Sequence, residues 1–133
     1  MRYDSVASLV TEEAPDRPVI CLRPTVLEAT ARRFASLFPG DVLYAVKCNP
    51  HADVLRALFC GGIRHFDTAS LAEVQLVREV LGPEAEAYFN HPVKARSAIT
   101  EASVRHGVRE FVVDSKDEIS KVAATAKGNS IHI

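Results

Sequence analysis

Asp41-Val-Leu-Tyr-Ala-Val-Lys-Cys-Asn-Pro50 is a short apolar run that ends in a lysine. The apolar part, Leu43 to Val46, lies between the turn signals Pro39-Gly40 and Asn49-Pro50, which predicts a buried strand. Lysine is almost never fully buried unless another group pairs with it. Lys47 is therefore either a solvated charge at the rim, the usual case, or an amine that partial burial keeps neutral for attack on a carbonyl.

Apolar and amphipathic segments alternate along the rest of the chain. The predicted strands are 42–46, 63–66, 85–89, 109–113 and 130–133, and the predicted helices between them are 50–60, 70–81, 94–106 and 116–126. Such alternation predicts parallel βαβ units with the active-site groups at the carboxyl ends of the strands. On periodicity alone, a (β/α) barrel and an open doubly wound sheet fit equally well.

The residues before this repeat are less regular. Residues 1–17 are mixed and polar and predict a loose arm, and residues 18–38 predict a leading strand at 18–22 and a helix at 25–37. Capping signals place the N-terminus of several helices: Thr25 with Glu28, Asn49 before Pro50, Ser70 with Glu73, and Ser115 with Glu118. The predicted last helix ends near Gly128.

Three blocks of this sequence resemble motifs of one enzyme family. Tyr44–Pro50 resembles the pyridoxal-phosphate lysine motif of the ornithine/lysine/diaminopimelate decarboxylases, whose barrel is of the alanine-racemase-like type, or fold type III. Phe66–Val74 resembles the second motif, and Tyr88–Arg96 resembles the third in its bacterial ornithine/lysine decarboxylase form. The resemblance covers residues 18–126 and implies a TIM-like parallel (β/α) barrel. Residues 39–133 would form about its first half, truncated within the fifth strand.

The resemblance also implies roles for particular residues. Lys47 would be the catalytic lysine that holds pyridoxal 5'-phosphate, with Ala45 and Asp67 beside the cofactor. His132 stands where the family usually has a fifth-strand arginine. Two other acidic residues have simpler explanations: a turn role accounts for Asp114, and a capping role accounts for Glu73. Because Ser70 can cap the following helix, Asp67 is not needed as a cap and is free for a functional role. No metal ligand is expected.

The implied reaction is decarboxylation of a basic amino acid, ornithine to putrescine or lysine to cadaverine, in polyamine biosynthesis. The family's phosphate loop, pyridine partner and dimer-interface groups lie in later parts, so we expect a homodimeric parent and an inactive 133-residue piece. That piece would expose two sheet edges and an apolar inner face. Two other readings stay open: a non-catalytic truncated or regulatory relative, and a cofactor-free aldolase-like Schiff-base enzyme.

Composition limits the remaining function classes. The chain has 133 residues, 47% of them hydrophobic and 25% charged, and its net charge is −1, so charge gives no reason to expect nucleic-acid or membrane-surface binding. The three cysteines are odd in number and lack zinc-ligand spacing, which is typical of reduced thiols. Residues 1–16 contain no apolar signal segment, and we therefore expect a cytoplasmic protein.

Overall fold

The computed structural model describes residues 2–126 and 130–132. Its centre is a five-stranded parallel sheet in the order β1-β2-β3-β4-β5. The strands are β1 (Leu43–Ala45), β2 (His65–Thr68), β3 (Glu86–Phe89), β4 (Glu110–Val112) and β5 (Ser130–His132). The helices between them are α3 (Ala52–Cys60), α4 (Leu71–Leu81), α5 (Arg96–His106) and α6 (Lys116–Thr125). The order follows the sequence without the reversal of a doubly wound sheet, so the barrel-type arrangement is confirmed.

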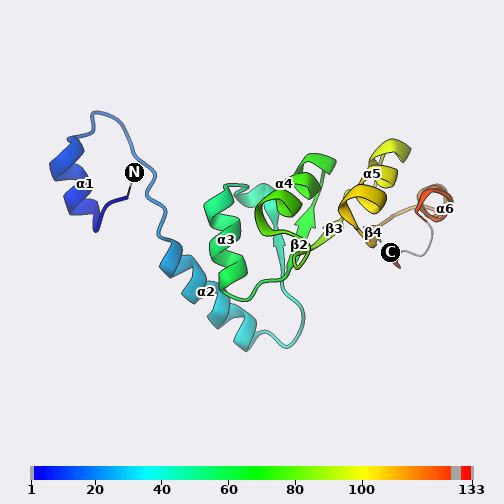
Figure 1. The fold of residues 1–133 in the computed structure, drawn as a ribbon. Coiled ribbons are helices and arrows are strands. Elements are labelled where there is room, and N and C mark those ends of the chain that lie inside the picture. The colour runs from blue at the N-terminus through cyan, green and yellow to red at the C-terminus, as the bar shows by residue number, and fades with distance from the viewer. Residues whose placement is uncertain (1, 127–129, 133) are drawn as a thin grey trace.

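One face of the sheet packs against the helices, and Figure 1 shows α4 and α5 on the same side of the strands. Side chains along a strand alternate between the two faces. Phe66, Phe89 and Phe111 are the large residues turned toward the helices, where they meet Val74 of α4 and Ile99 of α5 in one core. Each of the five is at most 3% exposed. This face holds the hydrophobic core of the chain.

The opposite face of the sheet is mainly polar, and the expectation of an apolar inner face is wrong. The alternate positions on β2 to β5 carry His65, Asp67, Glu86, Tyr88, Glu110 and His132. None of these side chains is fully buried. The apolar residues on this face are Leu43, Ala45 and Val112, on β1 and β4, the two strands from which the expectation was drawn. The polar face is the one that a closed barrel would turn inward.

The N-terminal part differs most from the prediction. The expected loose arm contains α1 (Val6–Glu13), which buries no residue and lies apart from the sheet (Figure 1). Its cap is reciprocal between Ser5 and Ser8, without the Glu or Gln that usually signals a capping box. Residues 18–22 do not form the predicted strand, and Ile20 is 96% exposed. A strand needs a neighbouring strand for its hydrogen bonds, and the described residues offer none there.

Two helices have other N-cap residues than predicted, and α5 begins two residues later than expected. The helix α2 (Pro24–Leu37) has Arg23 at its N-cap and Pro24 in its first turn, so Thr25 lies inside the helix and caps nothing. His51 caps α3, and Asn49 instead accepts a hydrogen bond from the His51 backbone N–H at 3.1 Å.

Ser70 and Ser115 cap α4 and α6 as predicted. Gly128, the predicted stop signal after the last helix, lies outside the described residues, as does Ile133. None of the helices that the structure describes is long and apolar enough to cross a membrane.

Candidate active site

The lysine of the first motif lies directly after β1. The predicted strand is shorter than expected, because Val46–Cys48 form a 3-10 turn, η1, that contacts β2. Val46 is fully buried and anchors the turn, whereas Lys47 is exposed. Within the described residues the ammonium of Lys47 makes no hydrogen bond or ion pair. The partial burial expected of a functional amine is therefore not found, and Lys47 lies at the carboxyl edge of the sheet as an exposed amine.

Ala45 and Asp67 lie side by side on neighbouring strands. They are register partners in the β1–β2 pairing, and Asp67 is in turn the partner of Tyr88 on β3. Asp67 was predicted to end its strand, but β2 continues to Thr68, so the carboxylate belongs to the strand itself and is half-buried. The structure thus brings two predicted cofactor residues, Ala45 and Asp67, into one row across β1 and β2. This row directly precedes the turn that carries Lys47.

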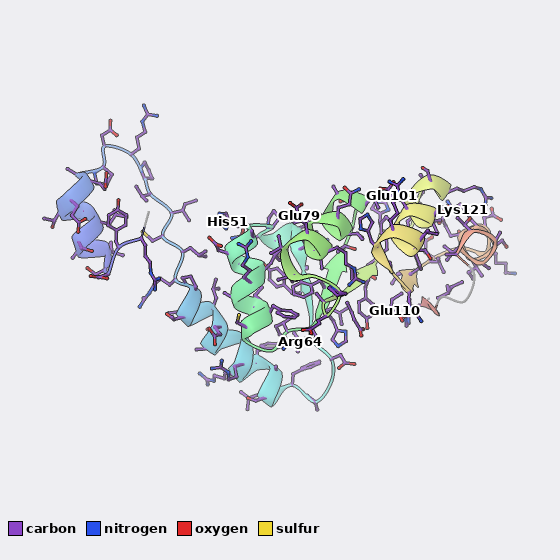
Figure 2. All side chains as sticks on the ribbon, viewed as in Figure 1. His51, Arg64, Glu79, Glu101, Glu110 and Lys121 are labelled. Atoms are coloured by element: carbon purple, nitrogen blue, oxygen red, sulfur yellow. The ribbon has the colours of Figure 1, made fainter. Side chains whose placement is uncertain are left out.

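His132 lies at the other end of the polar face. It is exposed on β5, and its Nε2 lies 2.6 Å from Oε2 of Glu110. Figure 2 shows Glu110 projecting from the sheet on the side away from α4 and α5. No contact joins His132 to Asp67 among the described residues. His132 is therefore held by a carboxylate, and two strands separate it from Asp67 and three from Ala45.

Tyr88 connects the two ends of this face and was not singled out from the sequence. Its hydroxyl lies 3.3 Å from Nδ1 of His65, and its ring centroid lies 6.4 Å from that of His132. Burial, together with the carboxylates of Glu86, Glu110 and Asp41, raises the pKa of Tyr88. The phenol therefore stays neutral near pH 7. Its alternation with the buried Ala87 and Phe89 was the signal that could have placed it here.

The third motif leaves one buried polar atom without a partner. Asn90 follows β3, and its backbone N–H donates to the Thr68 carbonyl at 2.9 Å, which extends the β2–β3 ladder by one residue. Its side-chain Oδ1 is buried and accepts no hydrogen bond from the described residues. Buried polar atoms in proteins nearly always have a partner, so this acceptor calls for a donor that the described residues do not supply.

Lys94 fixes the loop that follows Asn90. It is only 3% exposed, and its ammonium donates to the carbonyls of His91 at 2.7 Å, Pro92 at 3.3 Å and Val112 at 2.6 Å. Burial lowers the pKa of Lys94. His91, which follows Asn90 in the third motif, is exposed, and its Nδ1 accepts from the Val93 N–H at 3.2 Å. Lys94 and His91 therefore shape the loop rather than offering reactive groups.

The remaining strand-end acids have local roles or none. Ser70 accepts from the Glu73 N–H, and Oε2 of Glu73 accepts from the Ala69 N–H at 2.6 Å, one residue earlier than in a standard capping box. This contact confirms the structural explanation for Glu73. Asp114 is exposed beside the cap residue Ser115.

Comparison with known proteins identifies relatives for most of the chain. Residues 25–133 match the family described as "Pyridoxal-dependent decarboxylase, pyridoxal binding domain". Ornithine decarboxylase of Panagrellus redivivus is 33% identical over 119 residues, which cover 89% of this chain and 27% of that protein. Antizyme inhibitor 2 of Xenopus laevis is 41% identical over 93 residues, covering 68% of this chain and 20% of that protein.

Comparison of the structure with solved structures finds decarboxylases of the same kind. The crystal structure of lysine/ornithine decarboxylase from Vibrio vulnificus, complexed with putrescine, superimposes with a TM-score of 0.79 at 30% identity. The match covers 96% of this chain and 36% of that one. The chain spans about a quarter of the length of the curated relatives it matches.

Proposed function

Because the chain belongs to the pyridoxal-dependent decarboxylase family, through the family's pyridoxal binding domain, we propose that Lys47 is the lysine to which its enzyme attaches pyridoxal phosphate. The observation that carries the proposal is the position of Lys47 at the carboxyl edge of a barrel-type sheet, where its amine has no partner among residues 2–126 and 130–132. The buried acceptor of Asn90 on the same edge supports a bound group there. These residues fit the cofactor.

The other predicted residues complete the proposal. When bound, pyridoxal phosphate supplies an electron sink for loss of a carboxylate. Lys47 holds it through its amine. Ala45 presents only a methyl group, which leaves room on the sheet, and Asp67 places a negative charge in the same row. His132, whose ring Glu110 orients, is a further cofactor residue in this proposal.

The proposed substrate is a basic amino acid, ornithine or lysine, with putrescine or cadaverine as product and a place in polyamine biosynthesis. The names of the relatives and the putrescine bound to the Vibrio vulnificus structure support this substrate class. We also propose a homodimer for the full-length protein and a cytoplasmic location. The free, exposed thiols of Cys21, Cys48 and Cys60 are consistent with a reducing compartment.

The test uses the protein as its gene encodes it, with whatever follows residue 133. It is incubated with pyridoxal phosphate, reduced with borohydride and digested, and the pyridoxyl group is located by mass spectrometry. We expect the label on Lys47, and loss of label, of cofactor absorbance and of CO2 release from ornithine or lysine in Lys47→Ala. Lys116→Ala, which removes an exposed lysine on α6, is the matched control. Normal turnover in Lys47→Ala would contradict the proposal.

A second candidate function is that of a non-catalytic, regulatory relative. The 41% identity to Antizyme inhibitor 2 favours it, because that protein's name states inhibition of a protein rather than a decarboxylation. The same experiment separates the two functions. A regulatory relative would leave Lys47 unlabelled and release no CO2 from ornithine or lysine, while remaining folded.

A further inference from the structure

We propose that Asn90 is an additional residue of the cofactor pocket, whose side-chain carbonyl accepts a hydrogen bond from the nitrogen that joins Lys47 to the cofactor. The inference rests on the proposed function, because it needs a cofactor at Lys47. It adds a contact that neither the motifs nor the comparisons assign.

The position of Asn90 follows from the pairing of the strands. Its N–H donates to the Thr68 carbonyl, so the β3 backbone is still extended and paired at this residue. Alternation then places Asn90 on the same face as Tyr88, the polar inner face. It lies at the carboxyl end of that face, in the row above the one that contains Asp67 and Tyr88.

The neighbours of Asn90 explain why its Oδ1 lacks a partner. Continuing the register by one residue sets Ala69 on one side of it and Val112 on the other, and neither side chain has a donor. Lys94, the one cation buried among the described residues, gives its hydrogen bonds to three backbone carbonyls. An ammonium has three N–H groups, so none is left for Asn90. Among the described residues this row therefore supplies no donor to Oδ1.

Lys47 is the amine best placed to bring that donor. It lies on the turn after β1, and Asn90 directly follows β3, so their backbones are separated by about two inter-strand spacings, roughly 10 Å. A lysine and an asparagine side chain that reach toward each other span such a gap. Ala69, the residue after β2, stands between them in the continued register, and its side chain is only a methyl group. The nitrogen of Lys47 carries an N–H when it is joined to the cofactor in protonated form, which is the donor that Oδ1 requires.

The experiment compares Asn90→Ala and Asn90→Asp with the wild type, again in the protein as its gene encodes it. Gln75→Ala is the control, because it removes an exposed amide from α4 that bonds to Glu101. Three quantities are measured: the urea midpoint without cofactor, the dissociation constant for pyridoxal phosphate from fluorescence quenching, and the pH midpoint of the absorbance change of the Lys47-bound cofactor.

For Asn90→Ala we expect cofactor binding about tenfold weaker, since a hydrogen bond to a charged group is lost. The absorbance midpoint should fall by about one pH unit, because tenfold in affinity for the proton is one pKa unit. Asn90→Asp should raise the midpoint, because a carboxylate favours the protonated nitrogen. The urea midpoint of Asn90→Ala should not fall, since no protein hydrogen bond is removed, and Gln75→Ala should bind cofactor normally.

Two results would overturn the inference while leaving the proposed function intact: wild-type cofactor affinity and absorbance midpoint in Asn90→Ala, or a lowered urea midpoint in that variant with an unchanged absorbance midpoint. The second result would make Asn90 a purely structural residue. Failure of the wild type to form a bond between Lys47 and the cofactor would instead overturn the proposed function, and this inference with it.

Discussion

Replacing Lys94 with methionine tests how the carboxyl edge of the sheet is held together. The variant keeps most of the unbranched apolar stem but removes the ammonium that joins the His91–Pro92 loop to β4. Two of the three hydrogen bonds, to His91 and Val112, are short at 2.7 and 2.6 Å. A hydrogen bond to a charged group contributes about 1.5–3 kcal/mol, and a buried carbonyl left unpaired costs about 1–3 kcal/mol.

An opposing effect reduces the expected loss. Burial of the ammonium is itself unfavourable, as the lowered pKa of Lys94 indicates. Methionine removes this desolvation cost, and apolar replacements of buried charges are sometimes neutral. The variant loses two strong hydrogen bonds and leaves their carbonyls unsatisfied, but it also removes the cost of burying one charge. We expect a net destabilisation of roughly 2–4 kcal/mol.

Urea unfolding at neutral pH measures this difference, with Lys116→Met as the control for loss of a positive charge. Lys116 is exposed at the start of α6, so its replacement should change the free energy of unfolding by less than about 0.5 kcal/mol. If Lys94→Met is as stable as the wild type, or more stable, the desolvation cost outweighs the three hydrogen bonds. The reasoning about the loop is then wrong.

Three further predictions concern the elements that surround the site. Ser70→Ala should cost about 1 kcal/mol of stability in urea, with little effect on decarboxylation. Asp67→Ala should instead reduce turnover and leave the fold intact. Equal effects of the two variants on stability, with no effect of either on the rate, would contradict the assignment. Gly61→Ala should destabilise the protein by about 1–3 kcal/mol in thermal unfolding, because a Cβ there would lie 2.6 Å from a backbone oxygen of α2; a wild-type melting temperature would show that the two helices separate freely. Burial alone would raise the pKa of Glu118, but the hydrogen bond and charge of Lys121 lower that pKa on balance. The ionised Glu118 therefore contributes its full stability above pH 4.5, and this contribution is lost as the pH falls through the lowered pKa. Glu118→Gln should therefore show a smaller loss of urea midpoint between neutral and acidic pH, and an unchanged loss would contradict this.

The repeating units could be predicted because their signals are local. Alternation of apolar strands with amphipathic helices gave the five strands and the helices between them, and Ser70 and Ser115 gave two N-caps. Residues 18–22 were mistaken for a strand because their composition is apolar, and composition does not show whether a neighbouring strand is available. The start of α2 was misplaced because Pro24 in the first turn competes with the Thr25 signal.

The site was only partly predictable. Lys47 could be placed at a strand end from the turn signals on either side of it, and the register then set Ala45 beside Asp67. The polar inner face was missed because β1 and β4 were taken as representative, although Tyr88 alternates with apolar neighbours in the sequence. The unpartnered oxygen of Asn90 depends on what lies beside it on β2 and β4, which no single stretch of sequence contains.

Each strand of the sheet pairs with the strand that immediately precedes it in the chain, only one helix away. Closing such short loops loses little chain entropy, and a sheet assembled from them has only local contacts to find. The units can therefore form in the order in which the ribosome makes them, each new strand adding to the edge left by the last. In this order β1 and η1, which carry Lys47, are the template on which the later strands assemble, so defects there reach the whole sheet.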